Sequence, residues 1–135
     1  MQLVQHRPIG KTLAMASLGV IAGYVTLALA STVVQEVWLG GVSYRSSARS
    51  VLILAGVFTP LCAFLGGLVS GLIATHSRWL AAALLSALIA AETTTLYVTG
   101  RVDGPLWFEA GAGAALIAAV FAATWMCSRL LSRRR

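Results

Sequence analysis

The sequence predicts an all-α integral membrane protein, a compact four-helix transmembrane bundle with short loops and both termini on the cytoplasmic side. Of the 135 residues, 59% are hydrophobic and only 10% are charged, whereas about a quarter of the residues in a soluble domain are charged. The apolar residues fall into four runs, each close to the roughly 20 residues that a helix needs to cross a bilayer. The runs show no strand-like alternation, and backbone groups in lipid must be satisfied within the segment, so each run is expected to be a helix.

A single four-span membrane domain is expected to cover residues 1–135. Its predicted spans are residues of about 12–34, 51–75, 79–99 and 106–128. The polar residues concentrate in the connections between these spans. The second connection, from His76 to Arg78, is so short that the second and third helices must be antiparallel neighbours. Gly100 suits the C-terminal end of the third helix, and Pro105 suits the first turn of the fourth.

Basic residues near the span ends predict the orientation, because cytoplasmic connections carry an excess of Lys and Arg. With four spans, the N-terminus, the second connection and the C-terminus share one side of the membrane. That side holds seven basic residues and the other side holds three, namely Arg7, Lys11, Arg78, Arg129, Arg133, Arg134 and Arg135 against Arg45, Arg49 and Arg101. We therefore expect a multi-pass protein of the bacterial inner (plasma) membrane with both termini in the cytoplasm.

The first span also has a second interpretation, as a cleaved signal peptide. Residues 6–11 resemble a basic n-region, and Ala28-Leu29-Ala30 resembles a signal-peptidase site. The apolar stretch before that site is longer than the usual run of about 7–15 residues, which favours an uncleaved span. Cleavage stays open as the alternative.

Small residues recur at four-residue spacing in every predicted span. The first span has Gly19 and Gly23, and the second has Gly67 and Gly71. Helices in lipid associate by the close approach of such residues. The pattern predicts a tight bundle without an obvious pore, either a monomer or a dimer that uses one of these ridges.

Glu92 is the one ionisable side chain deep inside a predicted span, and Thr93, Thr94 and Thr95 follow it. At a rise of ~1.5 Å per residue, Glu92 lies roughly 10 Å below the end of its span at Thr99. A carboxyl at that depth is unfavourable and by default marks a functional site that faces the bundle interior. Three interpretations stay open: a neutral acid that joins helices, a site for a substrate, ion or proton, and a contact with a basic residue of another membrane subunit.

Pro60 predicts a kink in the second span. Proline cannot donate a backbone hydrogen bond, so it frees the carbonyl of Gly56, four residues earlier. By the same rise estimate, Gly56 and Thr59 lie within about one helical turn of the depth of Glu92. Thr26 of the first span lies at a similar depth. A protonated Glu92 would then donate to the Gly56 carbonyl or to a threonine hydroxyl, which makes these residues the candidate intramembrane polar site.

The other polar residues have simpler interpretations. Glu109 lies near the start of the fourth helix, where the helix dipole favours a carboxylate. Asp103 and Arg101 share one connection and are expected to pair at the surface. His6 and His76 are lone histidines in connections, so we expect them to be solvated or to face lipid headgroups.

The sequence carries no catalytic motif, so we expect a protein that is not an enzyme. It contains no phosphate loop, no paired carboxylates and no arrangement of a nucleophile with a base. Cys62 and Cys127 form no CxxC pattern or Cys/His cluster, so neither a metal nor another cofactor is expected. The basic residues cluster at the ends of apolar runs, which argues against nucleic acid as a partner.

These observations favour a small non-enzymatic four-span membrane protein, either an accessory or interaction subunit or a structural component of the membrane. The alternative is a small oligomeric transporter or channel with Glu92 as its coupling or selectivity residue. The expected partners are the lipid bilayer and either further copies of the chain or a different membrane subunit. The sequence indicates no particular small-molecule substrate.

Overall fold

The computed structural model describes residues 9–132. Its helices are α1 (Ile9–Thr32), the π-helical segment η1 (Val33–Trp38), α2 (Arg49–Ile73), α3 (Arg78–Val98) and α4 (Leu106–Ser132). Four helical stretches, with α1 and η1 counted as one, are long and apolar enough to cross a membrane. The prediction of four apolar helices is therefore confirmed. His6, Arg7 and the arginines at 133–135, on which part of the predicted orientation depends, lie outside the described residues.

The first helical stretch is longer than the sequence predicts. It begins at Ile9 and continues through η1 to Trp38, so the connection to α2 shortens to residues 39–48. The end of η1 is marked by a bond from the Leu39 amide to the Val34 carbonyl, 3.0 Å long and five residues apart. Gly40 and Gly41 then have φ angles of 69° and 88°, which glycine adopts without strain and other residues do not.

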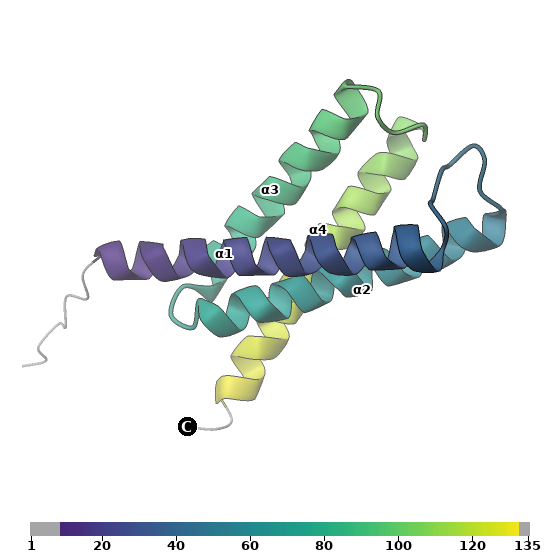
Figure 1. The fold of residues 1–135 in the computed structure, drawn as a ribbon. Coiled ribbons are helices and arrows are strands. Elements are labelled where there is room, and N and C mark those ends of the chain that lie inside the picture. Colours follow the sequence, from purple (N-terminus) through teal and green to yellow (C-terminus); the bar gives the residue numbers. More distant parts are fainter. Residues whose placement is uncertain (1–8, 133–135) are drawn as a thin grey trace, which may run out of the picture.

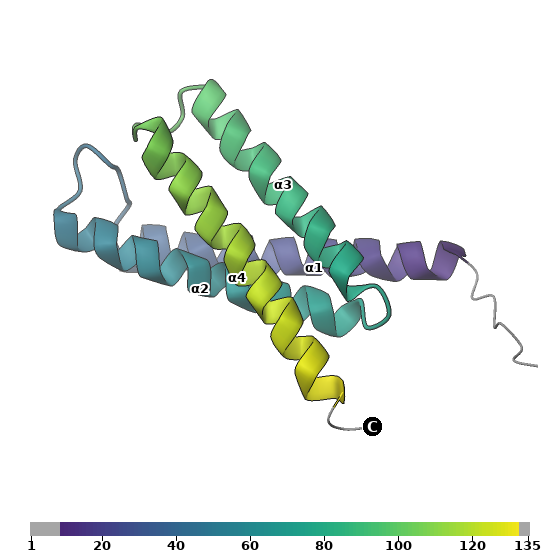
Figure 2. The same cartoon turned by 180° about the vertical axis from the view of Figure 1, so that it is seen from behind.

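Two antiparallel hairpins cross each other (Figures 1 and 2). The hairpin of α1 and α2 forms one pair, and the hairpin of α3 and α4 runs obliquely across it. At the crossing α2 lies between α1 and α4, and α3 contacts all three other helices. Within residues 9–132, α1 and α4 do not contact each other.

The crossing divides the molecule into two ends. The start of α1, the connection between α2 and α3, and the end of α4 lie on one side of the crossing, which we call the termini end (Figure 1). The longer connections, residues 39–48 and 99–105, lie on the other side, which we call the loop end. Toward the loop end the two hairpins diverge, so the helix surfaces buried at the crossing become exposed farther along.

Glycines allow α1 and α2 to touch backbone to backbone at the crossing. A methyl group added to Gly23 would lie 2.7 Å from the Gly66 carbonyl oxygen, and one added to Gly19 would lie 2.9 Å from the Ser70 carbonyl oxygen. A methyl group on Gly66 would in turn lie 2.6 Å from the Gly23 carbonyl oxygen. The sequence singled out Gly19 and Gly23 but not Gly66, which is the α2 side of the same contact.

A neighbouring face of α2 packs on α4. There a methyl group on Gly67 would lie 3.0 Å from Ala123 Cβ, and one on Gly71 would lie 3.5 Å from the Cys127 sulfur. Helix α2 therefore presents one small-residue face to α1 and another to α4. The side chains of Leu85, on α3, and Val120, on α4, fill the space between the hairpins and are fully buried.

Candidate functional site

A cavity of about 480 Å³ lies at the loop end, between the first half of α2 and the first half of α4. Its walls are mostly apolar. The connections at residues 42–44 and 101–103 cover it, and six polar side chains line it: Gln35, Ser43, Thr59, Arg101, Asp103 and Glu109. An apolar pocket with a few convergent polar groups is the usual form of a small-molecule site.

The π-helical segment places one of these polar groups. Gln35 lies on η1 and donates a hydrogen bond of 3.0 Å from its side-chain nitrogen to the Thr59 hydroxyl of α2. Pro60, the next residue, also lines the cavity. Because Pro60 has no amide hydrogen, the Gly56 carbonyl lacks its usual helical donor. Gly56 lines the cavity too, and a methyl group placed on it would meet nothing within 4 Å.

Asp103 holds the two connections of the loop end together. Its carboxylate accepts hydrogen bonds from the Ser43 hydroxyl, from the Tyr44 amide at 3.0 Å and from the Arg45 amide at 3.2 Å. The Ser43 hydroxyl, followed by the two backbone amides, lowers the pKa of Asp103 from its ordinary value of 3.8. The sequence suggested a surface pair with Arg101 instead. The structure gives Asp103 a different role, because the connection at 43–45 curls around its carboxylate.

Aromatic contacts also join the segments that surround the cavity at the loop end. The ring centroids of Tyr44 and Phe108 are 4.8 Å apart, which joins the first connection to the start of α4. A second pair, Trp38 with Phe58, joins η1 to α2, with ring centroids 4.8 Å apart in an edge-to-face arrangement. Offset or edge-to-face pairs of this kind stabilise a contact beyond its apolar area. The cover is therefore built from both connections rather than from one free loop.

Glu92 lies apart from this cavity, on the exposed surface of α3. Leu85 is seven residues earlier, two turns along the same side of the helix, and it is fully buried. Leu85 is buried and Glu92 is exposed because α3 leaves the α1–α2 hairpin toward the loop end (Figure 1). The Tyr24 phenol of α1 lies beside the Glu92 carboxyl and interacts with it.

The threonines of the predicted polar site are divided among three places. Thr94 and Thr95 donate to the carbonyls four residues earlier in α3, both at 2.7 Å, and Thr26 does the same in α1 at 2.8 Å. Thr93 packs against α4, with its methyl group 3.3 Å from the position of a methyl group on Gly113. The hydroxyls of Thr26, Thr94 and Thr95 thus donate within their own helices and not to another helix.

The structure therefore does not assemble the polar site as the sequence suggested. Gly56, Thr59 and Pro60 line one cavity together, whereas Glu92 is exposed on another helix and makes no hydrogen bond to Gly56 or Thr59 within residues 9–132. Gly56, Thr59 and Pro60 are neighbours because they lie within about one turn of α2. The depth estimated from the sequence does not determine which side of the bundle Glu92 faces.

Of the polar side chains that line the cavity, the predicted polar site contained only Thr59; Gln35 and Glu109 are two that it missed. Gln35 falls after the predicted end of the first span, and no residue signal marks the π-helical turn that carries it toward Thr59. Glu109 was assigned to helix-end electrostatics, yet its half-buried side chain also lines the cavity. Its position in the first turn of a helix that borders two polar connections is the signal that could have found it.

The described residues hold no group of three or more His, Cys, Asp or Glu side chains that could bind a metal ion. Cys62 and Cys127 are both free and buried. No protein-family model matches this chain, and no curated protein or solved structure shows significant similarity to it.

Proposed function

We propose that the chain is a non-enzymatic membrane subunit that binds a different membrane protein through α3. The observation that carries this proposal is the exposure of Glu92 on a helix apolar enough to lie in lipid. An ionisable side chain that faces hydrocarbon is unfavourable, whereas one that meets a polar group of another helix is not. A partner that covers Glu92 would therefore gain free energy from this one contact.

The surface around Glu92 has the form of a helix-binding face. Leu84, Leu88 and Thr95 lie on the same side of α3 at spacings of three or four residues from one another or from Glu92, and all are exposed. We call Leu84, Leu88, Glu92 and Thr95 the Glu92 face. The Glu92 face offers apolar side chains and, toward the loop end, a single carboxyl. These features suit contact with one helix of a partner.

Between residues 9 and 132 the structure supplies no basic partner for Glu92. Every basic residue between positions 9 and 132 lies in a connection or in the first or last turns of a helix: Lys11, Arg45, Arg49, Arg78, Arg101 and Arg129. The described part of a second copy of the chain would therefore present no basic side chain at this depth. A Lys or Arg side chain at matching depth in a different protein complements the carboxyl better, so we favour a different subunit over a homodimer.

The same proposal includes the cellular setting. We place the chain in the bacterial plasma membrane with the termini end on the cytoplasmic side. Residues 9–132 carry three basic side chains at each end, so the orientation rests on the further arginines of the sequence at 7 and 133–135, because basic residues favour the cytoplasmic side. Arg129 stacks over the Trp125 ring at 4.3 Å, a pair suited to the interface between lipid and water.

Site-specific photo-crosslinking in intact membranes tests the proposal. A photoreactive amino acid replaces Leu88 or Thr95, one turn on either side of Glu92. The control position is Val57 on α2, which is 55% exposed against 40% for Leu88. We expect an adduct with a protein of different mass from Leu88 and Thr95 but not from Val57.

The dependence on Glu92 makes the test specific. In Glu92→Leu the adduct should fall about threefold or more, because a polar contact between membrane helices contributes ~0.6 kcal/mol on average and up to ~1.7 kcal/mol. Glu92→Gln, which keeps a hydrogen-bonding group, should retain more of the adduct than Glu92→Leu. An adduct between two copies of the chain only, or an adduct unchanged in Glu92→Leu, would refute the proposal.

We also propose a second candidate function, the binding or transport of a small polar molecule, because a separate observation favours it. That observation is the cavity at the loop end, which brings the side chains of Gln35, Thr59 and Glu109 into one apolar enclosure. This second candidate corresponds to the transporter alternative from the sequence, with the residues of this cavity at its centre in place of Glu92. The Gly56 carbonyl adds an acceptor, and two carboxylates, Asp103 and Glu109, against the one guanidinium of Arg101 favour a neutral or cationic ligand over an anion.

Water access from the loop end tests this second candidate. Gly56→Cys introduces a thiol into the open space of the cavity, whereas Leu54→Cys introduces one on a residue that does not line it. The native Cys62 and Cys127 are buried, so they give a low background. A membrane-impermeant maleimide added on the loop side should label Gly56→Cys and spare Leu54→Cys. Equal labelling of both, or of neither, would exclude a ligand cavity open to water.

A further inference from the structure

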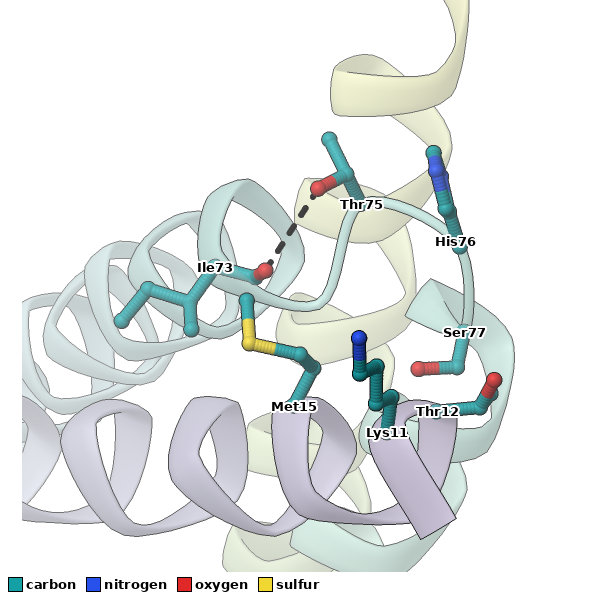
Figure 3. A pocket seen from close by; sticks show the side chains of 7 residues that line it. All are labelled: Lys11, Thr12, Met15, Ile73, Thr75, His76 and Ser77. Atoms are coloured by element: carbon teal, nitrogen blue, oxygen red, sulfur yellow. Dashed lines mark hydrogen bonds between the residues drawn. The ribbon is translucent and has the colours of Figure 1, made fainter. Parts of the chain in front are cut away.

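A second cavity, of about 440 Å³, lies at the termini end of the molecule. It is formed by the first turns of α1, the end of α2 and the connection between α2 and α3 (Figure 3). Met15 and Ile73 supply its apolar side. Its polar side faces the end of the bundle, which is the side that water and lipid headgroups would reach.

The polar lining of this cavity is cationic and rich in hydrogen-bond donors. Lys11 directs its ammonium group into the space between α1 and the connection, opposite the Ser77 hydroxyl (Figure 3). His76 and Thr12 line the same cavity, and none of its lining residues is acidic. A Lys ammonium without a lining carboxylate favours an anion in the space before it.

Ser77 gives an independent indication that a ligand belongs there. It immediately precedes α3, but its hydroxyl does not cap the helix. Its oxygen is buried and has no hydrogen-bond partner, which is unfavourable for a polar atom out of contact with water. The first amides of α3 also lack partners within the helix, and a helix start favours negative charge. An anion in the cavity would accept from the Ser77 hydroxyl and pair with Lys11.

We infer that this cavity binds a phosphate group, presented by an anionic lipid headgroup or by a free phosphate compound. Lys11 and Ser77 direct donors toward one space, which suits a group with several acceptor oxygens, and His76 and Thr12 line the same cavity. Met15 and Ile73 lie where the glycerol and acyl parts of a lipid would continue into the membrane. Both sources share the same recognition of phosphate, and the experiment below distinguishes them. This inference is independent of the Glu92 face and of the cavity at the loop end.

The test uses the purified full chain in nanodiscs of two compositions, phosphatidylcholine alone and phosphatidylcholine with phosphatidylglycerol. Native mass spectrometry measures the phosphatidylglycerol that stays bound after release from the nanodisc. The variants are Lys11→Met and Ser77→Ala, and the matched control is Arg49→Met, which removes a basic residue from a helix start at the loop end. Ser77→Ala leaves α3 uncapped as before, so folding should not change.

A lipid source predicts retained phosphatidylglycerol in the unmodified chain and in Arg49→Met. Lys11→Met should weaken retention about fivefold, which corresponds to ~1 kcal/mol for one basic residue, and Ser77→Ala should weaken it by a factor of about two or more. A free phosphate compound as the source predicts no such retention. Inorganic pyrophosphate should then raise the unfolding temperature in phosphatidylcholine nanodiscs, and Lys11→Met and Ser77→Ala should both abolish this rise.

Two results would overturn the inference. The first is an equal loss of lipid in Lys11→Met and Arg49→Met, which would show general attraction between basic residues and anionic lipid. The second is the absence of both retained lipid and stabilisation by pyrophosphate in the unmodified chain. If Lys11→Met does not fold, Ser77→Ala alone decides between these outcomes and the expected one.

Discussion

Replacing Gly23 by alanine should destabilise the bundle, whereas the same change at Gly71 should not. The added methyl carbon on Gly23 would lie 2.7 Å from the Gly66 carbonyl oxygen and 2.8 Å from Ser70 Cβ. Both atoms belong to the backbone of α2 or are attached directly to it, so α1 and α2 would have to separate. On Gly71 the nearest atom would be the Cys127 sulfur at 3.5 Å, an ordinary van der Waals contact.

The size of the effect follows from two opposing terms. Overpacking of a well-packed site destabilises by about 1–3 kcal/mol. Alanine stabilises a helix relative to glycine by about 0.5–1 kcal/mol. For Gly23→Ala the first term dominates, and the net loss is about 1 kcal/mol or more. For Gly71→Ala only the second term acts. The two variants should therefore differ by about 2 kcal/mol, or roughly thirtyfold in the ratio of folded to unfolded protein.

Reversible unfolding in mixed micelles of mild detergent and dodecyl sulfate measures this difference, with tryptophan fluorescence as the signal. Gly111→Ala is a further control, because a methyl group there meets nothing within 4 Å and reports the helix preference alone. Gly23→Ala should unfold at a lower fraction of dodecyl sulfate than either control. If Gly23→Ala matches Gly111→Ala in stability, then α1 and α2 do not pack through Gly23 and Gly66.

Two further predictions concern the loop end. The lowered pKa of Asp103 means that its contribution is present at neutral pH and is lost as the pH falls below 3.8 and through the folded-state value. The protection of the Tyr44 amide, measured as its hydrogen-exchange rate relative to an unstructured amide at the same pH, should therefore fall in acid, and Asp103→Asn should weaken this protection already at neutral pH. In a double-mutant cycle, Gln35→Leu and Thr59→Val should show a coupling free energy of ~0.6 kcal/mol in the same unfolding assay, and a coupling near zero would show that the hydrogen bond between η1 and α2 does not contribute.

The four helices could be predicted because their cause is local to each segment. A run of about 20 apolar residues determines a spanning helix almost regardless of its neighbours. The helix ends were predictable only where a residue imposes them. Gly100, with a φ of 67°, ends α3 with bonds from its own amide to Tyr97 and from the Arg101 amide to Leu96, the Schellman arrangement that glycine permits. Trp38 lies beyond the predicted end of the first span because a π-helical turn has no comparable residue signal.

The candidate site was only partly predictable, because depth and direction have different causes. The rise per residue gives the depth of Glu92 and Thr59 from the sequence alone. The side of the bundle that each one faces depends on how the hairpins cross, and α2 meets α4 there through Gly67, which lies close to Val120 and Ala123. The spacing of small residues indicated that α2 would pack closely. It did not indicate that Gly66 and Gly67 would serve two different helices.

One cause links the rigid crossing to both features of the loop end. Close contact of α1 with α2 at Gly23 holds the first hairpin together, while the buried side chains of α3 all lie between Ala81 and Ile89. Beyond that point α3 and α4 diverge from the first hairpin (Figure 2). The divergence exposes Glu92 on one side and opens the cavity between α2 and α4 on the other. A change that straightened the crossing would thus bury the carboxyl and close the cavity together, so the two features on which the proposed functions rest share one structural origin.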